Sequence, residues 1–182
     1  MLELFPDRTR TLRAGLLAAA LLALSASVPG SARADWTLAG DLEADVPVSL
    51  ERISAGFGFA VRIGYQLHLP LLTLTPEIGF HYAGFDPEPS LYRGIAGGRL
   101  GIGEVFRVGV FAHVGVGHAS FDTVVGDVSH TAFTFDLGAF LDLTILPLID
   151  IGIHAGYGNL SPEGEEDALQ WIPLGAHVAI VF

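Results

Sequence analysis

Ionisable side chains recur at alternate positions of otherwise apolar segments, and no other feature of the chain suggests its chemistry as clearly. Four Arg, three carboxylates and five His share this register: Arg62, Arg93, Arg99, Arg107, Glu77, Asp136, Asp142, His68, His81, His113, His154 and His177. Because side chains alternate across a β-strand with period two, all of them would lie on one face of a sheet. Such a face could form a proton or ion path, a histidine metal site, or a set of Arg–carboxylate pairs that fills an interior.

The pairing interpretation is favoured, because buried charges are tolerated only when they are paired. The histidines lie on separate strands without a repeated ligand spacing, so the sequence predicts neither a metal nor a cofactor. Arg107 is expected to meet Glu77 or Asp136, depending on how the strands are staggered.

A different chemistry is suggested by His118 and Ser120, which are separated by one residue. On a strand both would share a face, where an imidazole can act as general base for a serine nucleophile. A carboxylate normally orients the imidazole in such a site, but no Glu occurs between Ser120 and Glu163. A strand end that runs into a loop is the simpler interpretation of this short pattern.

Eight segments alternate between apolar and polar residues and are expected to be the strands that position these groups. In the segment 57–69 every odd-numbered residue is apolar, whereas the even-numbered residues are small, polar or charged. The expected strands are 36–46, 57–69, 72–82, 92–102, 106–116, 133–145, 149–157 and 172–182. Strands of about 10 residues are long enough to cross a bilayer when tilted.

The connections between these strands differ in length. Those near Pro70, Gly103 and Pro147 are tight, whereas those at 49–54, 86–90, 122–130 and 161–167 are longer and more polar. Short turns at one end and longer loops at the other are typical of a membrane barrel. Pro76 and Pro173 fall inside strands, where a closed barrel has no free edge for them. We expect a bulge at Pro76 and a position near the outer rim for Pro173.

The same alternation would suit a soluble sandwich or a lipocalin-like barrel with an apolar interior. About fifty large apolar positions would then have to fill one small interior, which its volume does not allow. The sequence therefore predicts an all-β fold, an eight-stranded antiparallel up-and-down transmembrane β-barrel whose apolar face points outward.

The first 34 residues are expected to be a cleaved signal peptide. Arg8, Arg10 and Arg13 precede the apolar run 14–24, and Ala32 and Ala34 are the small residues of a cleavage site. The expected organisation is thus a signal peptide, 1–34, and a barrel domain, 35–182. This barrel domain has five Arg, no Lys and eighteen Asp and Glu, a charge balance that argues against a nucleic-acid partner.

The signal peptide, the eight alternating strands and the terminal Val178-Ala179-Ile180-Val181-Phe182 resemble the small outer-membrane barrels of the OmpA/OmpX type. The resemblance implies a monomer in the outer membrane of a Gram-negative cell envelope, in contact with lipid and lipopolysaccharide. It also implies that Phe182 is the signal read by the barrel assembly machinery.

The expected function is structural or in surface interaction, with a lumen plugged by charged side chains. Seven residues are expected to form the plug: Arg62, Glu77, Arg93, Arg99, Arg107, Asp136 and Asp142. The alternative is an outer-membrane esterase similar to the lipid A deacylases, which resemble the chain in size and use a His-x-Ser pair with a Glu. In that alternative His118 and Ser120 would be catalytic, although Phe121 replaces the Asn that normally follows the Ser.

Overall fold

A computed structural model describes residues 34–48, 54–86, 89–123, 126–146, 148–161 and 168–182. The chain divides into two compact units, 1–32 and 33–182, and every described residue belongs to the second. The expected signal peptide lies outside the described residues except for Ala34, which begins the first strand. No helix in the described part of the chain is long and apolar enough to cross a membrane.

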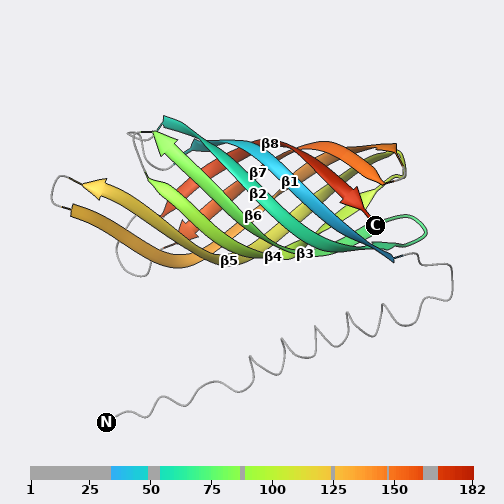
Figure 1. Ribbon diagram of the computed structural model, residues 1–182, viewed down its shortest axis with the longest axis horizontal. Helices are drawn as coiled ribbons and strands as arrows, with labels where there is room; N and C mark the ends of the chain where they lie inside the picture. The colour runs from blue at the N-terminus through green and yellow to red at the C-terminus, as the bar shows by residue number, and fades with distance from the viewer. Residues whose placement is uncertain (1–33, 49–53, 87–88, 124–125, 147, 162–167) are drawn as a thin grey trace, which may run out of the picture. The chain divides into compact units, whose positions relative to one another are not determined.

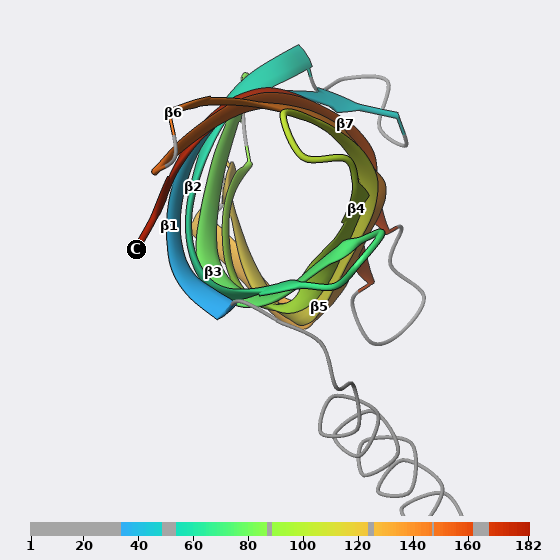
Figure 2. The ribbon, with the colours of Figure 1, turned by 90° about the vertical axis from the view of Figure 1, so that its right-hand side faces the viewer.

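Eight antiparallel strands form a closed barrel in which each strand pairs with its neighbours in sequence and β1 pairs with β8 (Figures 1 and 2). The strands are β1 Ala34–Pro47, β2 Ser54–His68, β3 Thr73–Asp86, β4 Ser90–Ile102, β5 Phe106–Thr123, β6 Gly126–Leu146, β7 Ile149–Ser161 and β8 Leu169–Val181. The predicted fold class is confirmed. Closure leaves no strand with an unpaired edge, which is the condition for a sheet to lie in lipid.

The two faces of the barrel follow the alternation seen in the sequence. On β2 the odd-numbered side chains from Phe57 to Tyr65 are exposed on the outside, whereas Arg62 and Gln66 are buried inside. On β5 the even-numbered residues from Val108 to Val116 point outward, opposite Arg107 and His113. An exposed apolar belt around a closed ladder is stable in a bilayer and unfavourable in water.

The two ends of the barrel differ in their connections. Leu69 and Leu72 exchange backbone hydrogen bonds of 2.8 and 3.3 Å in the turn between β2 and β3. Gly103 has a φ of 116° in the turn between β4 and β5, a conformation that only glycine adopts without strain. These turns share one end of the barrel with the start of β1 and with Phe182, while the connections after β1, β3, β5 and β7 lie at the other end, the loop end.

The longest hairpin corrects one expectation. Residues 122–130 were predicted to be a loop, yet β5 continues to Thr123 and β6 begins at Gly126, with these two residues paired. The two strands extend beyond the others in Figure 1. The segment mixes Gly and Asp with β-branched Thr and Val, and strand pairing overrides its turn-like composition.

The two strand prolines are accommodated without the bulge expected at Pro76. The register between β2 and β3 is the same on both sides of Pro76, and around this residue the ladder lacks the pairs at Thr75 and Pro76. Pro76 keeps its pairing with Gly98 on the other side. Pro173 lies four residues into β8, opposite Asp45, and interrupts the ladder only toward β7. Each missing N–H therefore affects one neighbour, and the closed barrel persists.

The loop end of the interior is apolar. The strands extend further toward this end than predicted, and their last inward residues form a buried cluster: Ala83, Phe85, Leu91, Ala119, Ala132, Leu160, Leu169 and Trp171. We call this cluster the apolar stopper. The charged side chains lie between the stopper and the turn end, so the lumen is filled in two layers.

The inside-out arrangement predicts that an outward charge is costly only at the depth of the lipid. Val114 is exposed near the middle of β5, where it pairs with Ala96 and Phe135. Val114→Arg should lower the free energy of unfolding in lipid by about 2–4 kcal/mol, which is the cost of Arg near the midplane. Urea titration of the refolded barrel in lipid vesicles measures this change.

Leu71→Arg is the matched control, because Leu71 is 82% exposed in the turn between β2 and β3. There the same change should cost only about 0–1 kcal/mol, as at a membrane interface. Equal effects of the two substitutions would contradict the lipid-facing assignment.

Candidate functional site: the lumen charge network

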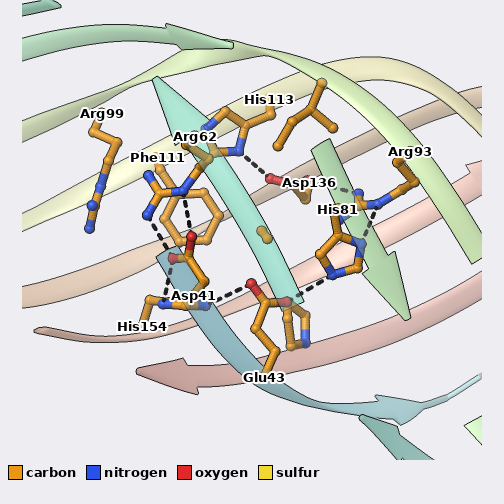
Figure 3. A pocket seen from close by; sticks show the side chains of 13 residues that line it. Asp41, Glu43, Arg62, His81, Arg93, Arg99, Phe111, His113, Asp136 and His154 are labelled. Carbon is orange, nitrogen blue, oxygen red and sulfur yellow. Dashed lines mark hydrogen bonds and ion pairs between the residues drawn. The ribbon is translucent and has the colours of Figure 1, made fainter. Parts of the chain in front are cut away.

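Arg62 crosses the middle of the lumen and joins three strands (Figure 3). Its Nε and Nη2 donate to Asp41 on β1 at 2.9 and 2.6 Å, and its Nη1 donates to both oxygens of Glu77 on β3 at 2.8 Å. None of the three side chains is more than 7% exposed. Charge-assisted bonds of this geometry are the strongest that a guanidinium forms, so Arg62 is a fixed centre of the lumen.

From Glu77 the network continues through His113. The ring nitrogens of His113 lie 2.8 Å from Glu77 Oε1 and 2.6 Å from Asp136 Oδ1. Because each nitrogen faces a carboxylate, His113 satisfies both partners only as a donor from both nitrogens. Arg93 completes this part, with Nη1 donating to Asp136 at 2.8 Å and Nε donating to His81 Nδ1 at 3.1 Å.

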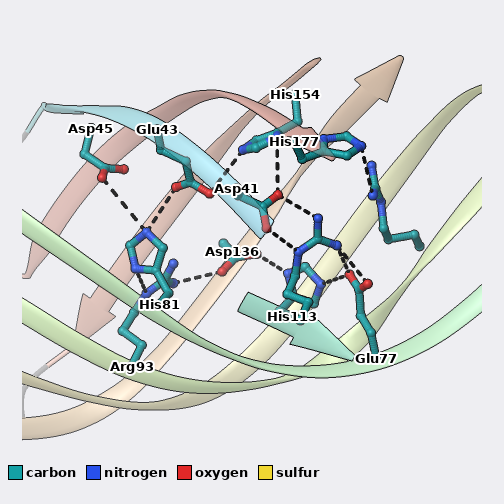
Figure 4. Close-up of polar contacts among 12 residues, drawn as sticks. Asp41, Glu43, Asp45, Glu77, His81, Arg93, His113, Asp136, His154 and His177 are labelled. Atoms are coloured by element: carbon teal, nitrogen blue, oxygen red, sulfur yellow. Dashed lines mark hydrogen bonds and ion pairs between the residues drawn. The ribbon is translucent and has the colours of Figure 1, made fainter. Parts of the chain in front are cut away.

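The network returns to β1 through two further histidines. His81 Nε2 lies 3.0 Å from Glu43 Oε2, and His154 Nε2 lies 3.1 Å from Glu43 Oε1. His154 in turn faces His177 (Figure 4). His177 Nε2 lies 3.0 Å from Asp142 Oδ1. These contacts connect β3, β1, β7, β8 and β6 around the circumference.

A looser group of ion pairs fills the turn end of the lumen. Arg107 Nη1 lies 3.3 Å from Asp150 and 3.6 Å from Asp142, and Asp150 also accepts a 2.6 Å hydrogen bond from Thr144. Arg99 Nη2 lies 3.4 Å from Asp142, and the Arg99 guanidinium stacks 3.8 Å from the centre of the Phe140 ring. The turn end thus has aromatic stacking and longer ion pairs in place of the short hydrogen bonds that Arg62 makes to its carboxylates.

The structure brings all seven predicted plug residues into one connected set, but with different partners from those expected. Arg107 contacts Asp142 and Asp150, whereas Glu77 contacts Arg62 and Asp136 contacts Arg93. The expected pairing of Arg107 with Glu77 or Asp136 is therefore wrong, because the stagger of the strands separates them.

Four carboxylates and four histidines that the plug prediction did not include also face the lumen: Asp41, Glu43, Asp45, Asp150, His81, His113, His154 and His177. The alternation in the sequence had already placed the four histidines on the inward face, and the four carboxylates share the same inward register of their strands. His68 lies apart from this set, 40% exposed near the turn end and 4.0 Å from Asp35.

Asp45 is an exception to the pairing rule. It is fully buried on β1, and in the described part of the chain neither of its carboxylate oxygens has a hydrogen-bond partner. The closest basic atom is His81 Nε2 at 4.0 Å, which already contacts Glu43. Gly58 on β2 makes room for this carboxylate, since a Cβ there would collide with it.

The space left in the lumen is small. Two cavities of about 40 and 30 Å³ remain, and Arg62 and Arg99 line both of them. Each holds at most a few water molecules.

His118 and Ser120 lie on β5 near the loop end. His118 is exposed on the outer face, and its Nδ1 lies 2.9 Å from Thr131 Oγ1 on β6. The position that would orient the imidazole is thus occupied by a hydroxyl rather than a carboxylate. Glu163, the next Glu along the chain, lies outside the described residues.

Phe182 ends the chain on the outer face of the barrel. Its backbone exchanges hydrogen bonds of 2.8 and 2.9 Å with Trp36 on β1, and its side chain is exposed. The terminal residue thus extends the seam between β8 and β1.

No model of a protein family matches the chain, and no curated protein matches its sequence. Solved structures with the same fold include Neisserial surface protein A, with a TM-score of 0.62 and 15% identity over 82% of this chain and 99% of that one. The attachment invasion locus protein Ail of Yersinia pestis has a TM-score of 0.52 and 14% identity over 82% of this chain and 97% of that one. The outer membrane enzyme PagL has a TM-score of 0.50 and 16% identity over 77% of this chain and 98% of that one.

At these identities the likeness concerns the fold. The chain is an eight-stranded transmembrane β-barrel, and its fold is that of the small outer-membrane barrels.

The pairing of the lumen charges predicts opposite effects for two Asp→Asn substitutions. Asp136→Asn removes the charge that Arg93 and His113 contact, and should destabilise the barrel by about 3–5 kcal/mol, as when one partner of a buried ion pair is lost. Asp45→Asn removes a buried charge without a partner and should stabilise the barrel by ~1–3 kcal/mol. Urea unfolding of the refolded variants tests both, and equal losses would contradict the partner assignment.

Proposed function

We propose that the chain is a monomeric barrel of the outer membrane with a closed lumen, and that its role is structural or in surface interaction rather than catalytic. The observation that carries this proposal is the continuous set of buried ion pairs, from Asp150 at the turn end to Glu43, above which lies the apolar stopper. A lumen filled in this way favours mechanical stability over transport, because charged groups held by several partners do not move aside cheaply.

The orientation of the barrel across the outer membrane determines which partners each of its ends would meet. The turn end carries both termini of the barrel and is assigned to the periplasm, so the loop end would face lipopolysaccharide. Phe182, exposed at the seam between β8 and β1, is in a position to be read by the barrel assembly machinery before the seam closes. The closed ladder offers no free strand edge to a second subunit, which supports a monomer.

The closed lumen predicts little conductance. In planar bilayers the wild-type barrel should show at most rare, small openings, because the charged layer and the apolar stopper form two barriers in series. Arg62→Ala should join the two small cavities, and Leu91→Ala should weaken the stopper. We expect openings from the double variant that neither single variant shows. Steady, large conductance of the wild type would rule out the closed lumen.

A second function, hydrolysis of lipid A acyl chains, is supported by the outward position of His118 and Ser120 and by the fold shared with the enzyme PagL. The contact between His118 and Thr131 weighs against it, because a hydroxyl does not stabilise an imidazolium as a carboxylate does. Mass spectrometry of lipid A from cells with and without the protein should give identical acylation. Loss of an acyl chain that depends on Ser120, tested with Ser120→Ala, would establish the enzyme instead.

A further inference from the structure

His154 and His177 turn the same ring nitrogen toward each other inside the lumen (Figure 4). Their Nδ1 atoms are 3.4 Å apart, and their side chains are 7% and 0% exposed. The opposite nitrogen of each ring contacts a carboxylate, Glu43 for His154 at 3.1 Å and Asp142 for His177 at 3.0 Å. Each imidazole is therefore oriented by a carboxylate that contacts its Nε2, the nitrogen that points away from the other ring.

The two carboxylate contacts favour the tautomer in which each ring carries its proton on Nε2. A neutral imidazole has one N–H, and the Nε2 of each ring must donate it to the adjacent carboxylate. Arg99 Nη1 also approaches His177 Nε2, but at 3.4 Å it is more distant than Asp142. The two Nδ1 atoms consequently face each other with lone pairs, and this contact is repulsive unless a cation lies between them.

Asp41 supplies a third donor on the same side. Its Oδ1 lies 3.9 Å from His154 Nδ1, and Asp41 and His177 are direct partners across the seam between β1 and β8. One ligand atom from each of the three residues lies within 4.8 Å of the ligand atoms of the other two. The Asp41 carboxylate also accepts from Arg62, but a carboxylate oxygen has a second lone pair for another ligand.

Two glycines create the space that the rings occupy. His154 pairs with Gly175 across β7 and β8, and His177 pairs with Gly152 on the same two strands. A Cβ at Gly175 would lie 2.5 Å from His154 Nε2, and one at Gly152 would lie 2.6 Å from His177 Cε1. Each ring lies over the glycine of the neighbouring strand, so the two imidazoles can converge.

We propose that His154 Nδ1, His177 Nδ1 and Asp41 Oδ1 bind one divalent transition-metal ion of the zinc class. Two ligands at zinc distances of about 2.0–2.1 Å and a tetrahedral angle are about 3.3–3.4 Å apart, which matches the observed Nδ1 separation. Two imidazoles and one carboxylate suit Zn²⁺ and its neighbours rather than Ca²⁺ or Mg²⁺, which prefer oxygen ligands. Glu43 and Asp142 then act as the carboxylates that orient metal-bound imidazoles.

Other lumen histidines do not offer the same arrangement. Both nitrogens of His113 are engaged by carboxylates. His81 lies beside Glu43 and Asp45, but Arg93 donates to its Nδ1 and thereby keeps the proton on Nε2, the nitrogen that faces those carboxylates. A small cavity lined by Asp41 and His154 leaves room for a water as a further ligand of the proposed ion.

The proposed ion would connect β7, β8 and β1, the strands on both sides of the closing seam. It would also offset an excess of negative charge. In the described part of the lumen four Arg face seven carboxylates: Asp41, Glu43, Asp45, Glu77, Asp136, Asp142 and Asp150. The site is independent of the loop partners, so it holds whether the barrel is a structural protein or an esterase.

The test is titration of the barrel, purified from membranes in detergent and stripped with a chelator, with Co²⁺ and then Zn²⁺. We expect one Co²⁺ per chain, with the visible absorption of a low-coordinate site, and displacement of Co²⁺ by Zn²⁺. His154→Ala and His177→Ala should abolish the absorption. Asp142→Asn, which changes the group that orients His177 but removes no proposed ligand, should weaken binding by about 10–100-fold.

His118→Ala is the matched control, because this histidine lies on the outer face away from the lumen. The control should bind Co²⁺ as the wild type does. Binding that is lost in the control but kept in His177→Ala would overturn the proposal, as would the absence of stoichiometric binding by the wild type.

Folding failure of the variants would not leave the question open, since the wild type can be examined directly. Long-range ¹H–¹⁵N spectra of its imidazoles should show two rings whose Nδ1 resonances shift on addition of Zn²⁺ while Nε2 remains protonated. A proton held between the two Nδ1 atoms, with no response to Zn²⁺, is the competing arrangement and would exclude the metal site.

Discussion

Apart from Asp45, the charged side chains buried in the described lumen contact oppositely charged or hydrogen-bonding partners, and the need for such partners organises the interior. Moving a guanidinium or a carboxylate out of water costs several kcal/mol of hydration free energy per ion. Only close partners of opposite charge offset this cost. Arg62 meets the requirement with four short contacts to Asp41 and Glu77. Because those partners come from β1 and β3, satisfying one Arg fixes three strands relative to one another. Repeated around the barrel, the same requirement links strands that are distant in sequence, as Glu43 links β3 to β7.

The sequence was sufficient to predict the architecture, because alternating apolar and polar residues in segments of bilayer-spanning length are typical of a barrel in lipid. An outward Phe59 and an inward Arg62 on the same strand leave one consistent assignment of faces. The inward register also identified the charged residues of the plug. It could not identify their partners, because a partner depends on the stagger between strands, and neither Arg107 nor Glu77 carries local information about stagger. The site of His154 and His177 was missed for the same reason, since its ligands come from three strands and show no spacing along the chain.

Predictions from local composition were wrong where backbone pairing between strands outweighs the turn propensity of the residues. The turn-like residues 122–130 largely form strand because β5 and β6 continue to pair, and Pro76 lies in a regular register because its missing N–H affects only one neighbour. The apolar stopper was also missed. The strand predicted to end at Tyr82 continues to Asp86, and the strand predicted to begin at Tyr92 begins at Ser90. Inward residues near the loop end, such as Leu91, therefore lay outside the predicted strands and were assigned to neither face of the sheet.

The distribution of partners has a consequence for how the barrel closes. Asp41 and Glu43 lie on β1, whereas His154 and His177 lie on β7 and β8, so the contacts among them form only when β1 meets β8. Before closure these groups would be desolvated in part without their partners, which makes half-closed states unfavourable. Backbone pairing across the seam and the side-chain contacts beneath it therefore form together. Closure becomes a cooperative step, and its last backbone pair joins Trp36 to Phe182, the residue at which the chain ends.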